Sequence, residues 1–175
     1  AASYNNIGEV YRIQGKDKEA LKYYFTGLKI SEQLNDIRRI GEFYNNIGII
    51  YDLSGKFDEA MDYYLKSIKI DEEIGNRHGI AGGYVNIGFV CMGKGNYSEA
   101  FDYFNRGINL GRELIYKDAI LGAYEGFYET YLKMGDFKKA LDYYRMHTEA
   151  NDSILNTESS AQIAEMQTKY ESEKK

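Results

Sequence analysis

The sequence repeats itself every 40 residues. The segment "YNNIGIIYDLSGKFDEAMDYY" at residues 44–64 has counterparts at residues 4–24 and 84–104, and the register continues without insertion into a fourth copy that begins at Tyr124. Self-similarity at a fixed period is typical of arrays in which each unit buries its apolar surface against the next one. The period therefore predicts a stack of four similar units.

Each unit carries two apolar stripes at helical spacing. In the second unit the stripes are Tyr44, Ile47, Gly48 and Tyr51, and then Phe57, Ala60, Tyr64 and Ile68. Between them Gly55 can take the left-handed conformation that ends a helix. The chain also contains 18 glycines and no proline, as expected for long helices. Each unit should thus form two amphipathic helices.

These patterns predict an all-α fold, an α-solenoid in which antiparallel helix pairs form a right-handed superhelix. Small residues such as Gly48 and Ala60 would let neighbouring helices approach while aromatic side chains fill the gaps beside them. The predicted boundaries place the array at residues 1–155, with units at about 1–35, 36–75, 76–115 and 116–155, and a further helix at 156–175.

The repeat resembles the tetratricopeptide repeat (TPR). The family signature W-x2-L-G-x2-Y, followed by A-x3-F, is matched here by Tyr4-x2-Ile7-Gly8-x2-Tyr11 and by Ala20-x3-Tyr24. The resemblance covers residues 1 to about 150. The period of 40 instead of 34 and the missing proline imply helices longer by about a turn. The resemblance also implies a non-catalytic scaffold that binds a protein or peptide on its inner surface.

The C-terminal segment differs from the units. Ile163, Met166 and Tyr170 form one thin apolar seam in a polar, helix-prone stretch, which fits either a capping helix or the start of a coiled coil. Residues 162–175 resemble the stretch that joins a TPR sensor region to a coiled coil, a transmembrane helix and a histidine kinase or helix-turn-helix output in bacterial membrane-anchored signalling proteins. That resemblance implies a sensor role and an extracytoplasmic location if the protein is so anchored, or otherwise a cytoplasmic one. A homodimer through the C-terminal helix is a further possibility.

The candidate ligand-binding residues lie on the predicted first helices, at positions that packing does not explain. They are Asn5, Asn6, Glu9, Asn45, Asn46, Asn86 and Glu125. Asparagine is a poor helix former, and a line of amides could pair with the backbone of an extended peptide. Alternatively, each amide bonds a neighbouring helix and stiffens the array. Because the face is acidic and lacks a basic clamp, a neutral or mildly basic segment suits it better than a peptide carboxylate.

Other functional classes find little support in the sequence. The 22 basic and 27 acidic residues give a net charge of −5 without a basic block, which argues against nucleic acid and anionic membranes as partners. Cys91 occupies a tyrosine position of the repeat and reads as a packing residue, while His78 and His147 lie far apart in the sequence. We therefore expect no enzyme activity, no metal and no cofactor. The alternative to a binding module is a structural spacer or dimerisation module.

Overall fold

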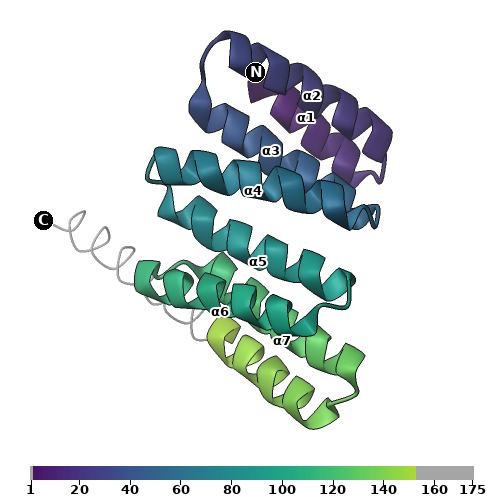
Figure 1. Ribbon diagram of the computed structural model, residues 1–175, viewed down its shortest axis with the longest axis vertical. Coiled ribbons are helices and arrows are strands. Elements are labelled where there is room, and N and C mark those ends of the chain that lie inside the picture. Colours follow the sequence, from purple (N-terminus) through teal and green to yellow (C-terminus); the bar gives the residue numbers. More distant parts are fainter. Residues whose placement is uncertain (1, 153–175) are drawn as a thin grey trace, which may run out of the picture.

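The computed structural model describes residues 2–152, and within this range every regular element is a helix (Figure 1). The helices are α1 (Ala2–Ile13), α2 (Asp17–Gln33), α3 (Ile37–Leu53), α4 (Phe57–Glu73), α5 (Arg77–Gly93), α6 (Tyr97–Leu114) and α7 (Lys117–Met134), followed by a helix over residues 137–152. They form four successive pairs stacked along one axis (Figure 1). The predicted all-α solenoid of antiparallel helix pairs is confirmed.

The stack curves towards the first helices of the pairs. Helices α1, α3, α5 and α7 contact one another in sequence order, whereas among α2, α4 and α6 no such contact occurs within the described residues. First helices that lie closer together than second helices make their side the concave one. We call the surface formed by α1, α3, α5 and α7 the inner face.

The glycines of the repeat make room for buried aromatic rings. A Cβ atom at Gly48 would lie 2.8 Å from the ring of Tyr64, and one at Gly8 would lie 2.5 Å from the ring of Tyr24. Both rings are almost completely buried. Because real Cβ atoms do not approach a ring this closely, glycine is the residue that fits. The spacing of the repeat thus reflects helix contact within each pair.

The joints inside the pairs use left-handed glycines, as the sequence predicts: Gly55 has φ +70°, and Gly15, Gly95 and Gly135 are similar. The joints between pairs need the same conformation at Asn35, Gly75 and Ile115. Ile115, with φ +55°, is unusual there because a β-branched residue fits the left-handed region poorly. The left-handed conformation of Ile115 was not evident from the sequence.

The unit boundaries proposed from the sequence, at residues 35, 75, 115 and 155, remain predictions. The expected helix at 156–175 lies outside the described residues, and with it the proposed coiled coil and homodimer contact.

A candidate groove on the inner face

The side chains of four predicted site residues form a ladder of hydrogen bonds across the inner face. Asn86 of α5 donates from Nδ2 to Oδ1 of Asn45 on α3, at 3.0 Å. Asn45 donates to Oδ1 of its neighbour Asn46 at 3.3 Å, and Asn46 donates to Oδ1 of Asn5 on α1 at 2.7 Å. The ladder therefore links the first three helix pairs.

This ladder bears on the two roles considered for the asparagines. The amides do bond neighbouring helices, which is the stiffening role. Yet Asn5, Asn45, Asn46 and Asn86 are all partly exposed, and a side-chain amide has two N–H donors and two acceptor positions, of which the ladder uses only part. The same amides thus retain hydrogen-bonding capacity towards solvent on the inner face. Asn6 is exposed and stands apart from the ladder.

The two predicted acidic residues have different surroundings. Glu9 accepts a hydrogen bond from Nε of Arg12 at 2.8 Å and another from the hydroxyl of Tyr24 at 3.1 Å. The hydrogen bond from Arg12 lowers the pKa of Glu9. Glu125 on α7 is exposed. Neither residue hydrogen-bonds to the ladder, and neither lines the cavity that the ladder residues Asn45 and Asn86 border.

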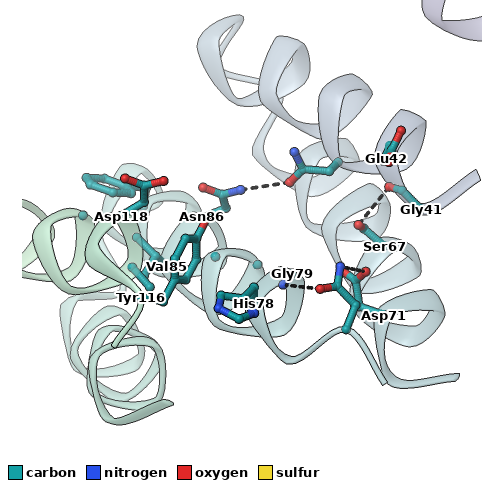
Figure 2. Close-up of a pocket in the computed structure, with 17 residues that line it drawn as sticks. Gly41, Glu42, Ser67, Asp71, His78, Gly79, Val85, Asn86, Tyr116 and Asp118 are labelled. Carbon is teal, nitrogen blue, oxygen red and sulfur yellow. Dashed lines mark hydrogen bonds between the residues drawn. The ribbon is translucent and has the colours of Figure 1, made fainter. Parts of the chain in front are cut away.

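That cavity has a volume of about 400 Å³ and lies where α3, α5 and α7 run side by side (Figure 2). We call it the groove. Its lining consists of Gly41, Glu42, Asn45, Ser67, Asp71, Asn76, His78, Gly79, Gly82, Gly83, Val85, Asn86, Phe89, Tyr116, Asp118, Ala119 and Gly122. Of the predicted site residues, Asn45 and Asn86 line it. In Figure 2, Asp118 and Tyr116 lie on one side, Glu42 and Asp71 on the other, and Asn86 and His78 between them.

The floor of the groove is rich in glycine, and one glycine has no packing role. A Cβ atom at Gly83 would collide with the side chain of Ile68, and one at Gly41 would lie 2.8 Å from Ile70. At Gly82 a Cβ atom would meet nothing within 4 Å. Glycine within a helix costs about 1 kcal/mol relative to alanine. Packing does not account for that cost at Gly82, and its effect is to leave the groove open.

Three carboxylates line the groove, and lysine and arginine are absent from the lining. Glu42 and Asp118 are exposed, whereas Asp71 is 8% exposed and accepts a hydrogen bond from Nδ2 of Asn76 at 2.8 Å. Burial raises the pKa of Asp71, while Asn76 and the more distant Arg38 act in the opposite direction. The groove is therefore an acidic surface.

Sequence reasoning missed the aromatic wall of the groove. His78 meets Tyr116 edge to face with ring centroids 4.9 Å apart. Burial raises the pKa of Tyr116, and Asp118 adds to this effect. The sequence places His78 in a polar joint and predicts a surface residue, and the side chain is indeed exposed. In the structure His78 lies in the first turn of α5 and Tyr116 directly before α7, so only the stacking of the pairs brings these two rings together.

Comparison with known proteins identifies the repeat. Two tetratricopeptide-repeat models match the sequence, one over residues 1–73 and the other over residues 81–112, which together cover more than half of the chain. The chain belongs to the tetratricopeptide-repeat family. A comparison with curated proteins finds no significant match.

Many solved structures share the fold of this TPR chain. BtubC from P. vanneervenii is 19% identical with a TM-score of 0.72, and the match covers 86% of this chain and 63% of BtubC. A Rap protein complexed with Competence and Sporulation Factor is 20% identical with a TM-score of 0.76, covering 84% and 41%. A signal transduction ATPase with a tetratricopeptide repeat sensor, from Pyrococcus horikoshii, is 18% identical with a TM-score of 0.72, covering 89% and 24%. The TPR chain thus spans less than two thirds of each of these proteins.

The one cysteine of the TPR chain lies in the core. Cys91 is 1% exposed, as predicted for a packing residue, and burial raises its pKa to about 11, which disfavours the reactive thiolate. Within residues 2–152 no cluster of three potential metal ligands occurs. Of the helices described in the structure, none combines the length and apolarity needed to cross a bilayer.

Proposed function

We propose that this TPR chain is a non-catalytic interaction module that holds an extended peptide segment of a partner protein in the groove. The observation that carries the proposal is the open floor at Gly82 beside the partly exposed amides of Asn45 and Asn86. An extended segment presents backbone N–H and C=O groups, and side-chain amides can pair with both. The Rap structure, which contains a bound factor, offers support by analogy.

We further propose that the module is the sensor region of a bacterial signal-transduction protein. The support is the resemblance of residues 162–175 to the linker of such proteins, together with the fold shared with a signal transduction ATPase that carries a TPR sensor. The flanking genomic sequence tests this proposal. We expect a transmembrane helix and an output domain to follow soon after residue 175, and a continuation without an output domain would contradict it.

Selection from a phage-displayed library of random 12-residue peptides tests the binding role. The protein comprising residues 1–175 serves as bait. Selected peptides are synthesised, and their affinity for the protein is measured by titration. We expect micromolar binding that is weakened at least tenfold by Gly82→Leu, because the added side chain projects into the groove without meeting other atoms near its Cβ.

Gly82→Ala is the matched control for this experiment, since its single methyl group leaves most of the groove open. We expect this variant to bind within about twofold of the wild type. Failure to select any peptide, or equal binding to wild type and to Gly82→Leu, would contradict the proposal. Asn86→Ala then measures how much the ladder contributes to the affinity.

A further inference from the structure

We infer that the groove selects segments that carry a basic side chain, and that this side chain enters the space above Gly82 between Glu42 and Asp118. The inference rests on the proposed function, because it names the chemistry of the ligand that the same groove would bind. It is argued from the charge of the lining, from the shape of the floor and from the aromatic wall.

The charge of the lining has one sign. Glu42 on α3, Asp71 on α4 and Asp118 on α7 come from three helices and face a single cavity. Arg38 lowers the pKa of Asp71 but does not line the groove. A cleft with charges of one sign and low-dielectric walls concentrates the opposite charge. The uncompensated carboxylates therefore favour a cationic group.

Asp71 adds a buried acceptor to the exposed ones. Its Oδ1 accepts a hydrogen bond from Asn76, and its Oδ2 faces Gly79, where a Cβ atom would collide with it. Asp71 thus contributes negative charge to the groove from a position held by Asn76.

The floor and the wall fit the shape of a long basic side chain. The absence of a Cβ atom at Gly82 leaves room for an alkyl stem over α5, whereas Gly122 of α7 packs against the side chain of Val85. The rings of Phe89 and Tyr116 line the same space. Aromatic faces accept both the stem and the cationic head of arginine or lysine. A neutral polar side chain would make only part of these contacts.

Paired peptides test the inference directly. The probes are two end-capped glycine-serine nonapeptides, one with a central arginine and one with citrulline, its uncharged near-isostere, in the same place. Backbone amide shifts of Gly82, Asn86 and Gly122 are followed by two-dimensional NMR during titration. We expect the arginine peptide to shift these signals at concentrations at least fivefold lower than the citrulline peptide.

Charge-neutralising variants locate the effect. Glu42→Gln and Asp118→Asn change exposed residues, so we expect the fold to be kept and the advantage of arginine over citrulline to fall two- to fivefold for each, since exposed ion pairs contribute modestly. Glu73→Gln, an exposed α4 residue outside the groove, is the control and should leave that advantage unchanged.

The outcomes separate this inference from the proposed function. Equal titration of both peptides, or no shift of these amides with the arginine peptide, overturns the preference for a basic side chain. The library-selected peptides could still bind in a manner that Gly82→Leu blocks, which would leave the proposed function standing. If the arginine peptide shows no preference and Gly82→Leu does not weaken binding of the selected peptides, both the inference and the proposed function are overturned.

Discussion

The first three helix pairs and the fourth pair carry the same repeat, but they bury it differently. In the second pair Gly48 lies under the ring of Tyr64, which is 2% exposed. In the fourth pair Tyr128 takes the place of that glycine, and the corresponding Tyr144 is 52% exposed. The two tyrosine rings of the fourth pair tilt against each other at 5.4 Å instead. The ring is therefore buried only where a glycine makes room for it.

A glycine of the fourth pair instead makes room for an aromatic ring of the third pair. Gly126 of α7 packs against the ring of Phe104, so that this ring lies between glycines of two helices, Gly88 and Gly126. Gly126 stands at the repeat position that is asparagine in the first three pairs. The ladder therefore ends at Asn86, and the α7 side of the groove is formed by Asp118 and Gly122 in place of amides.

The largest effect is expected when the two corresponding tyrosine rings, Tyr64 and Tyr144, are removed one at a time. Tyr64→Ala should lower the free energy of unfolding by about 3–5 kcal/mol, because it removes a large side chain from a fully packed site and leaves a cavity. Tyr144→Ala should cost about 1 kcal/mol or less, because half of that side chain is already in water. Urea denaturation followed by circular dichroism measures both.

Similar losses for the two variants would show that the fourth pair depends on its tyrosine as much as the inner pairs do. The comparison would then fail, and the exposure of Tyr144 would have no energetic meaning.

A second test contrasts two glycines. Gly48→Ala should destabilise the chain by about 1–3 kcal/mol, because the new methyl group would overlap the ring of Tyr64. Gly82→Ala should stabilise it by up to about 1 kcal/mol, because the space is free and alanine is the better helix former. Thermal unfolding of both variants under one buffer condition measures the difference. A loss of stability for Gly82→Ala would mean that this glycine has a structural role after all.

Much of the fold could be predicted from the sequence because its information is local. The glycine, alanine and tyrosine positions recur at one spacing, and the glycine column at 8, 48 and 88 faces a ring on the partner helix of its own pair. The left-handed conformation of Ile115 could not be predicted, because isoleucine opposes it and only the geometry of the joint imposes it.

The site could be predicted less well. The amides were visible because asparagine is costly in a helix, and the pattern repeats. Three other lining residues stand at positions where the residue type changes from unit to unit: Asp118, Tyr116 and His78. They meet only through the stacking of α5 and α7. Gly82 lies outside the recurring glycine columns, and the open space around it is evident only from the structure.

The smallest effect concerns Asp52, a partly buried carboxylate of the second pair whose counterpart in the fourth pair is Leu132. Burial raises the pKa of Asp52 to about 6, against about 4 in an unfolded chain. Between these values the folded state holds a proton that the unfolded state releases, so this group makes the chain less stable as the pH rises from about 4 to about 6.

Asp52→Asn keeps the shape without the charge, and it should stabilise the chain at pH 7 more than at pH 4. The effect is modest because water still reaches the side chain and screens it. Urea midpoints of the wild type and variant across this pH range measure the difference, with Asp62→Asn on the exposed side of α4 as the control. A difference between wild type and Asp52→Asn that does not change with pH would show that Asp52 is hydrated as fully as the exposed carboxylates, and that the second pair is no drier at this position than the fourth.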